Sequence, residues 1–279
     1  MSARSNPRPL TRAVIIGASG RMGEALLRAA PTFPQLIVTG AIASADSLAL
    51  GRDAGRLAGT GNANLLITSD LPAALAQADV ALDFSNSAAT RGNLQACRAA
   101  RKPLLLGATG FGAELDAELE ATAREVALLV APNTSLGAAV LGEITGEVAR
   151  ALPPAFDIDV LELHHRLKED APSGTALTLA RIAAGARGLP VPGSGTSPAA
   201  PPGPRPEEGR IGLASLRAGD IVGEHTVLFC GAGEDLVLTH RVRERGVFAR
   251  GALAAALWLS SQPPGRYGMS DFIFNKTEG

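Results

Sequence analysis

Short apolar runs alternate with stretches of helical apolar spacing along the first half of the chain. The first run, Ala13-Val14-Ile15-Ile16, is fully apolar, and Glu24 to Ala30 follows it with helical spacing. Further helices are expected at 88–100 and 113–124. Alternation of this kind predicts βαβ units and a parallel sheet. The other expected strands are Leu36–Ala41, Leu65–Thr68, Val80–Asp83, Pro103–Leu106 and Val126–Ala131.

The pattern changes after residue 134. Ser135 is placed to cap a helix over Leu136–Ala151, and Pro153-Pro154 then breaks the chain. We therefore expect a dinucleotide-binding domain over 1–134, with a C-terminal return at 245–279, and a second domain over 135–244. The second domain is expected to hold a strand (158–163), a helix (176–186), a Pro/Gly-rich loop (187–209) and three strands in an antiparallel sheet (210–217, 221–230, 235–242). The C-terminal return is expected to hold a helix (248–261) that packs back on the first domain.

Composition narrows the class of protein. The 279 residues are 46% hydrophobic and 19% charged with a net charge of −1, which disfavours nucleic acid and anionic membrane as partners. Cys97 and Cys230 form no CxxC motif, and no cluster of residues suggests a metal site. Without an apolar leader near the first residue or a run long enough for a membrane helix, the expected location is the cytoplasm.

A glycine-rich turn follows the first strand directly. Gly17, Gly20 and Gly23 stand in Gly17-Ala18-Ser19-Gly20-Arg21-Met22-Gly23, between a buried strand and a helix. Glycines in this position allow a tight turn, close approach to a pyrophosphate and close helix–strand packing. An ordinary structural turn is the alternative, but the position favours dinucleotide binding.

Small or polar residues also follow three other strands of the predicted sheet. They are Asp83-Phe84-Ser85, Gly107-Ala108-Thr109-Gly110-Phe111 and Pro132-Asn133-Thr134-Ser135. Each alone fits an ordinary βα turn, but together they fit a nicotinamide-ribose pocket, because ligands bind at the carboxyl ends of parallel strands. The predicted cofactor-binding residues are Gly17, Ala18, Ser19, Gly20, Arg21, Met22, Gly23, Asp83, Phe84, Gly107, Thr109, Pro132 and Asn133.

The segment from Glu162 to Thr175 concentrates chemically active side chains. His164, His165 and Lys168 precede Pro172-Ser173-Gly174-Thr175, which is typical of a helix start. A helix N-terminus binds carboxylate or phosphate, while histidine and lysine supply protons and positive charge. A single histidine beside a strand is more often structural, but the density of these groups favours a pocket for an anionic substrate that is protonated during the reaction.

These motifs resemble the 4-hydroxy-tetrahydrodipicolinate reductase family, also called dihydrodipicolinate reductase. The resemblance runs almost end to end, through the glycine-rich turn, Gly107–Phe111, Ala131-Pro132-Asn133, Glu162–Leu177, Arg217–Thr226 and Leu238–Arg241 with Arg245, Phe248 and Gly251. It implies an α/β protein with an N-terminal Rossmann-type doubly wound parallel sheet and an α+β substrate domain with an open mixed sheet. It also implies a homotetramer joined through the second sheet.

The resemblance further implies reduction of a cyclic imine dicarboxylate to tetrahydrodipicolinate by NAD(P)H, in lysine and diaminopimelate synthesis. By family pattern His164 is the general acid or positions the substrate, and Lys168 is a second proton donor. Ser173, Gly174 and Thr175 would hold a substrate carboxylate, helped by His165 and Thr109. Whether the hydrated or the dehydrated ring is the substrate stays open.

Three positions depart from the family pattern. Gly40–Ser44 lacks the acidic residue that would hold a ribose 2′-hydroxyl and the arginine often found beside it, and Asp46 lies two residues further on. Arg21 is placed to meet a 2′-phosphate, which favours NADPH over NADH. Thr134 stands where the family usually has Phe, and the loop 187–209 is less polar. Two alternatives remain: a non-catalytic nucleotide sensor, and another two-domain dehydrogenase of amino or semialdehyde acids.

Overall fold

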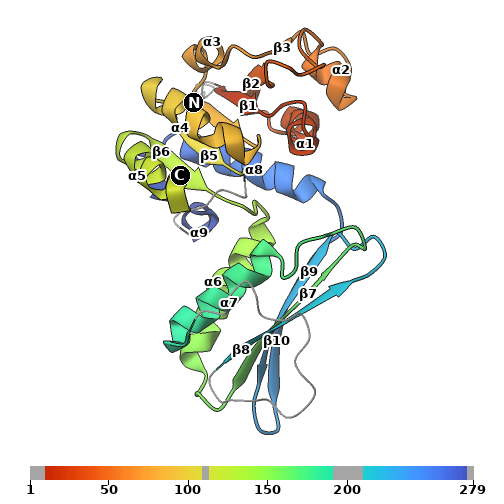
Figure 1. The fold of residues 1–279 in the computed structure, drawn as a ribbon, viewed down its shortest axis with the longest axis vertical. Helices are drawn as coiled ribbons and strands as arrows, with labels where there is room; N and C mark the ends of the chain where they lie inside the picture. Colours follow the sequence, from red (N-terminus) through yellow and green to blue (C-terminus); the bar gives the residue numbers. More distant parts are fainter. Residues whose placement is uncertain (1–9, 109–112, 191–209, 275–279) are drawn as a thin grey trace, which may run out of the picture. The chain divides into compact units, whose positions relative to one another are not determined.

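The computed structural model describes residues 10–108, 113–190 and 210–274, and divides the chain into two compact units. Unit 1 comprises residues up to Thr134 together with those from Gly246 onward, and unit 2 comprises Ser135–Arg245 (Figure 1).

Unit 1 is built on a parallel sheet of seven strands in the order β11-β6-β5-β4-β1-β2-β3. The central strands are buried along nearly their whole length, as expected for a parallel sheet covered on both faces. The chain order reverses between β1 and β4, the position where doubly wound sheets bind ligands. The strands are β1 (Thr11–Ile16), β2 (Leu36–Ile42), β3 (Ile67–Thr68), β4 (Val80–Asp83), β5 (Leu104–Leu106), β6 (Ala127–Val130) and β11 (Gly265–Tyr267).

Helices flank this sheet. The last long one, α8, is contributed by the chain after unit 2, and it packs on α1, β4 and β5 with a face rich in buried alanine. The predicted return of the C-terminal helix to the first sheet is therefore found. The helical elements are α1 (Arg21–Ala29), η1 (Ala30–Thr32), α2 (Ala54–Ala58), α3 (Leu71–Ala76), α4 (Ser87–Ala99), η2 (Ala113–Leu115), α5 (Asp116–Glu125), α8 (Gly246–Leu259) and α9 (Met269–Phe274).

Unit 2 is a four-stranded sheet, ordered β10-β9-β7-β8, with two helices on one face (Figure 1). The strands are β7 (Asp157–His164), β8 (Ile211–Arg217), β9 (Gly223–Cys230) and β10 (Asp235–Val242), and the helices are α6 (Leu136–Ala151) and α7 (Gly174–Arg187). Every second residue of β7 is buried, which places Ile158, Val160, Glu162 and His164 on the helix-covered face.

The expected antiparallel arrangement of the three later strands is wrong for β8. Strands β9 and β10 are antiparallel, but β8 pairs with β7 in parallel, from Ile158 opposite Ile211 to His164 opposite Arg217. The reason is the helix α7, which lies between β7 and β8 in the chain and provides the crossover that a parallel pair needs. The sheet is therefore mixed, as the family resemblance implies.

Boundaries and short elements also differ from expectation. Helix α1 begins at Arg21 rather than Glu24, and α2, α3, β11 and α9 were not predicted. The capping predictions are confirmed, since the hydroxyls of Ser135 and Ser173 accept hydrogen bonds from the amides of Ala138 and Ala176.

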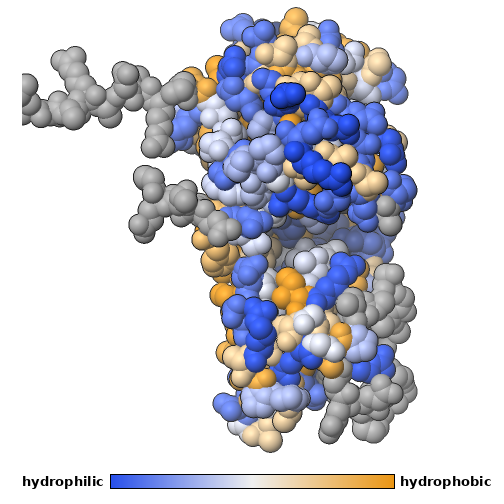
Figure 2. All heavy atoms as spheres, turned by 90° about the vertical axis from the view of Figure 1, so that its left-hand side faces the viewer, coloured by the Kyte–Doolittle hydropathy of each residue, from blue (hydrophilic) through white to orange (hydrophobic). Residues whose placement is uncertain are grey.

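Hydrophilic residues cover most of the face in Figure 2, with hydrophobic ones scattered between them. No helix in the described ranges is long and apolar enough to cross a membrane.

Candidate functional site

The glycine-rich turn presents an uncapped helix start. Gly17 has φ +83°, and its amide and that of Ala18 both donate to the carbonyl oxygen of Ile42 at the end of β2. A Cβ on Gly23 would lie 2.2 Å from the Gly17 carbonyl oxygen, so α1 packs against the turn closely enough to require glycine there. Gly20, the N-cap of α1, makes no side-chain capping bond, which leaves the first amides of α1 suited to an anion.

Phe84 brings three of the predicted turns together at the ends of β1, β4 and β5. An added Cβ on Gly17 would lie 2.8 Å from the Phe84 carbonyl oxygen, and one on Gly107 would lie 2.1 Å from the Phe84 ring. The structure therefore places Gly17, Phe84 and Gly107 against one another. Thr109, predicted for both cofactor and substrate, lies outside the described residues.

Asp83 is directed into the core of unit 1. Its side chain is fully buried, and its carboxylate accepts hydrogen bonds from the Ser85 amide and the Asn93 side chain, both 2.9 Å long. Burial raises the pKa of Asp83 in spite of these bonds. Its carboxylate thus fixes the turn that carries Phe84, and a direct contact with a cofactor stays a prediction.

The turn after β6 is attached to α8. Pro132 is exposed and Asn133 half-buried, while Thr134 is buried and donates from its hydroxyl to the Phe248 carbonyl oxygen over 2.7 Å. The threonine that departs from the family pattern therefore anchors the first turn of α8 with a hydrogen bond.

The segment after β2 lies beside the glycine-rich turn. The hydroxyls of Ser47 and Ser19 are 3.4 Å apart, and a hydrogen bond from the Ser44 side chain holds the pKa of Asp46 below its usual range. Arg21 is the exposed first residue of α1. A Rossmann fold holds the adenosine ribose at this turn and segment. The side chains there include serine hydroxyls, the carboxylate of Asp46 and the guanidinium of Arg21.

In unit 2, Glu162 is the centre of a buried polar network. Its side chain is fully buried. Its two carboxylate oxygens accept hydrogen bonds of 2.9 and 3.0 Å from the two terminal nitrogens of Arg217. It also accepts a hydrogen bond from His164 Nδ1 and one from the Ser173 amide, the latter 3.2 Å long. Burial opposes ionisation, but the bonds from His164 and Arg217 prevail and hold the pKa of Glu162 well below its usual range.

His164 is nearly enclosed by its neighbours. Its side chain is 11% exposed, and the ring of His225 meets it edge-on with 5.2 Å between centroids. A Cβ on Gly223 would lie 3.1 Å from His164 Nε2, so the glycine at the start of β9 makes room for the imidazole. Its two ring nitrogens therefore have distinct surroundings: Nδ1 faces Glu162 and Nε2 faces Gly223.

Lys168 is partly buried and ion-paired. Its ammonium lies 2.6 and 2.7 Å from the two oxygens of Asp170, whose own side chain is 66% exposed. Arg217 holds the backbone of the same segment, donating to the carbonyl oxygens of Lys168 (3.2 Å) and Asp170 (2.7 Å). Lys168 is thus fixed by two neighbours, through its side chain and its backbone.

The start of α7 combines a satisfied cap with open space. The Ser173 hydroxyl accepts from the Ala176 amide (3.2 Å) and contacts His225 Nε2 (2.9 Å), so its bonding capacity is used within the protein. Gly174 is exposed, and nothing lies within 4 Å of where its Cβ would be. Ligand binding here therefore falls to the backbone of Gly174 and Thr175, with Ser173 shaping the helix start.

His165 pairs with an arginine from the end of unit 2. Arg245 Nη2 lies 3.1 Å from His165 Nε2, and since arginine only donates, Nε2 accepts and Nδ1 carries the proton. Burial first, and then the nearby Arg245, lower the pKa of His165. A neutral His165 next to Arg245 adds one donor and one positive charge to the cluster.

Sequence reasoning assigned no role to four residues of this cluster: Glu162, Arg217, His225 and Arg245. Strand alternation does carry a signal for Glu162, because it places a carboxylate on the same face as Val160 and His164. No pattern reveals that Arg217, on another strand, pairs with it.

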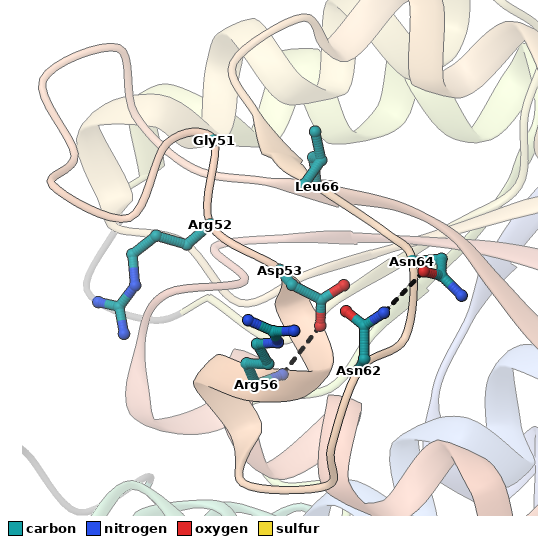
Figure 3. A pocket seen from close by; sticks show the side chains of 7 residues that line it. All are labelled: Gly51, Arg52, Asp53, Arg56, Asn62, Asn64 and Leu66. Carbon is teal, nitrogen blue, oxygen red and sulfur yellow. Dashed lines mark hydrogen bonds between the residues drawn. The ribbon is translucent and has the colours of Figure 1, made fainter.

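A cavity of about 640 Å³ in unit 1 involves none of the predicted site residues (Figure 3). Asp53 lines it and holds the surrounding loop. Its carboxylate accepts hydrogen bonds from the backbone amides of Arg56 and Ala63, both 3.0 Å long, and of Leu65, 3.2 Å long. The cavity is lined by Gly51, Arg52, Asp53, Arg56, Asn62, Asn64 and Leu66. No group of metal-ligating side chains occurs among the residues that the structure describes.

Comparison with known proteins covers both units. Residues 11–134 match the family model described as "Dihydrodipicolinate reductase, N-terminus", and residues 137–273 match "Dihydrodipicolinate reductase, C-terminus". The 4-hydroxy-tetrahydrodipicolinate reductase of Anaeromyxobacter dehalogenans strain 2CP-1 is 43% identical over 95% of this chain and 98% of its own, and that of Methylocella silvestris is 44% identical over 94% and 96%. Dipicolinate-bound dihydrodipicolinate reductase from Paenisporosarcina sp. TG-14 has a similar fold, with TM-score 0.75 at 22% identity over 94% of this chain and 99% of that one.

Proposed function

Because the chain belongs to the dihydrodipicolinate reductase family, we propose that its two units hold the two reactants of that family's reaction. The chain is an oxidoreductase that reduces the cyclic imine dicarboxylate derived from 4-hydroxy-tetrahydrodipicolinate to tetrahydrodipicolinate with NAD(P)H, in lysine and diaminopimelate synthesis. The observation that carries the site assignment is the cluster in which Glu162 contacts both His164 and the start of α7.

A nicotinamide dinucleotide fits the turns of unit 1. The first amides of α1 would bind the pyrophosphate, and Gly23 allows the helix to lie close to the turn. The turns carrying Phe84 and Gly107 adjoin Gly17 and would hold the nicotinamide ribose. When bound, the dinucleotide supplies the hydride.

NADPH is the proposed preferred form. Arg21 is exposed at the start of α1, where its guanidinium can meet a 2′-phosphate with charge-assisted bonds. Asp46 would accept from a ribose 2′-hydroxyl in NADH, but its carboxylate is already bonded to Ser44. The balance favours the phosphate-bearing dinucleotide.

The substrate dianion is proposed to bind at the start of α7. Backbone amides of Gly174 and Thr175 would grip one carboxylate, and neutral His165 would donate to it. Lys168 would exchange its contact with exposed Asp170 for the ring, where hydride addition builds negative charge. His164, held at Nδ1 by Glu162, would deliver or position the proton through Nε2.

Oxidation of NADPH in the presence of the cyclic substrate tests the site. We expect His164→Gln to reduce kcat by roughly 10²-fold or more, the scale of a lost proton donor. Arg12→Lys, on an exposed ion pair with Asp79 in unit 1, is the control and should leave kcat unchanged. Full activity of the His164 variant would contradict the assigned role, whereas a wild-type protein that binds dinucleotide without turnover would favour the sensor.

A homotetramer joined through the second sheet remains a proposal from the family pattern, and a cytoplasmic location remains a proposal from the sequence. Exposed Leu216 on β8 and Val237 on β10 lie on the face of the sheet that the helices leave open, and give it apolar surface that a partner copy would cover. Light scattering with size-exclusion chromatography measures the assembly, and Val237→Asp should reduce its mass if the sheet forms the interface. An unchanged mass would place the interface elsewhere.

A further inference from the structure

Glu162 is a charged residue on the buried face of its strand. It stands on the helix-covered side of β7 between Val160 and His164, and none of its side chain is exposed. An unpaired carboxylate in such a position is strongly destabilising, a cost that a hydrophobic residue would avoid. The full set of partners around it explains how the protein accommodates this charge.

Arg217 holds Glu162 and the Lys168 segment at once. The two terminal nitrogens of its guanidinium form a fork that binds both carboxylate oxygens of Glu162, a geometry that lysine does not reproduce. The same guanidinium donates to the carbonyl oxygens of Lys168 and Asp170. One side chain therefore joins β7 to the loop that carries the proposed cation.

Glu162 joins the two other parts of the site. One of its oxygens accepts the Ser173 amide at the start of α7, and the other accepts His164 Nδ1. Since an ionised carboxylate only accepts, Nδ1 must carry a proton, and Nε2 is left as the nitrogen that exchanges a proton with a ligand. The His164 ring, the backbone carbonyl of Lys168 and the Ser173 amide at the start of α7 are therefore all hydrogen-bonded to the Glu162–Arg217 pair.

We propose that Glu162 and Arg217 are positioning residues for the reaction: the pair fixes the tautomer and direction of His164 and holds Lys168 and the start of α7 at set distances from it. The inference rests on the roles proposed above for His164 and Lys168. Neither member of the pair needs to touch the substrate.

Glu162→Gln is the primary test, because it keeps size and removes the charge. We expect kcat to fall roughly 10- to 10²-fold, the scale found when a partner that orients a histidine is lost. The KM for NADPH should not change, since the proposed dinucleotide residues belong to unit 1. Nitrogen-15 NMR of the His164 ring, assigned with His164→Gln, should show the proton on Nδ1 in the wild type and a mixture of tautomers in Glu162→Gln.

Arg217 gives a second, independent test. Arg217→Lys retains the charge but loses the fork, so kcat should fall although the ion pair persists, and it carries the test if Glu162→Gln does not fold. Arg217→Ala should regain part of its activity with guanidinium at a non-denaturing concentration. Arg12→Lys alters a similar arginine–aspartate fork in unit 1 and is the matched control, with no expected change in kcat.

The outcomes separate this inference from the proposed function. Folded Glu162→Gln and Arg217→Lys proteins with wild-type kcat, together with an unchanged His164 nitrogen spectrum, would overturn the positioning role alone if His164→Gln and Lys168→Ala lose activity. If those two variants also retain activity, the proposed site itself is wrong.

Discussion

His225 should make unit 2 sensitive to mild acid. The imidazole is 4% exposed on β9; its Nε2 lies 2.9 Å from the Ser173 hydroxyl, and its Nδ1 has no partner among the described residues. Burial, and then the neighbouring His164, lower the pKa of His225 from 6.5 to about 4. The folded protein therefore holds this ring neutral at a pH where the unfolded chain would protonate it.

The sign and size of the effect follow from proton linkage. Because the folded pKa lies below the unfolded one, the stability is fully present above pH 6.5 and is lost as the pH falls through the folded value. From a pKa of about 4 against 6.5, the loss is about 2 kcal/mol at pH 5 and about 3 kcal/mol at pH 4.

The replacement His225→Gln removes the titrating group and keeps a polar atom near Ser173. Urea unfolding followed by far-UV circular dichroism, at pH 7 and pH 5, gives the free energy of unfolding of each protein. Fluorescence would follow the wrong unit, because Trp258 lies on α8. We expect the wild type to lose about 2 kcal/mol more than the variant between these pH values.

Equal losses in the two proteins would refute the reasoning, because they would show that His225 has the same proton affinity folded and unfolded. Between pH 7 and pH 8 the imidazole is largely neutral in both states, so the difference between the proteins should change there by less than about 0.2 kcal/mol. A larger change in that range would point to another group.

Three further predictions concern the proposed ligand sites. Lys168→Ala should lower kcat by roughly 10²-fold, the scale of a lost charge stabiliser, and an unchanged kcat removes Lys168 from the mechanism. Replacing Arg21 by Ala should raise the KM for NADPH roughly 10-fold more than that for NADH, as loss of one charge-assisted bond predicts, and equal increases argue against a 2′-phosphate contact. Gly23→Ala should lower the melting temperature and weaken dinucleotide binding, because its Cβ would lie 2.2 Å from the Gly17 carbonyl oxygen. Gly92→Ala on α4 is the control: nothing lies within 4 Å of the new Cβ, so helix propensity should raise stability by up to about 1 kcal/mol, and equal melting temperatures for the two variants would contradict the packing argument.

Strands β1 to β6 of unit 1 were predictable because each contains a short apolar run between turn residues. Helices α6 and α7 were predictable because each starts at a capping serine. The short helix α3 was missed, although Asp70 caps it and Pro72 is at its start. Strand β11 has no apolar run, and only its pairing with β6 defines it.

The candidate site divides in a similar way. His164, Lys168 and the start of α7 lie within twelve residues, so their density is visible in the sequence. Arg217 is 55 residues from Glu162 and meets it only because β8 pairs in parallel with β7. Local patterns contain no information about that pairing, so the fork between the two residues was not predictable.

The return of the chain to unit 1 has a consequence for biosynthesis. A ribosome completes β1 to β6 long before it makes α8, whose buried face covers α1, β4 and β5, and before it makes β11, which extends the sheet beyond β6. Unit 2, in contrast, is continuous and emerges in one piece. The later-synthesised unit can therefore finish folding first, while the sheet of unit 1 keeps an apolar flank uncovered until α8 and β11 have been made.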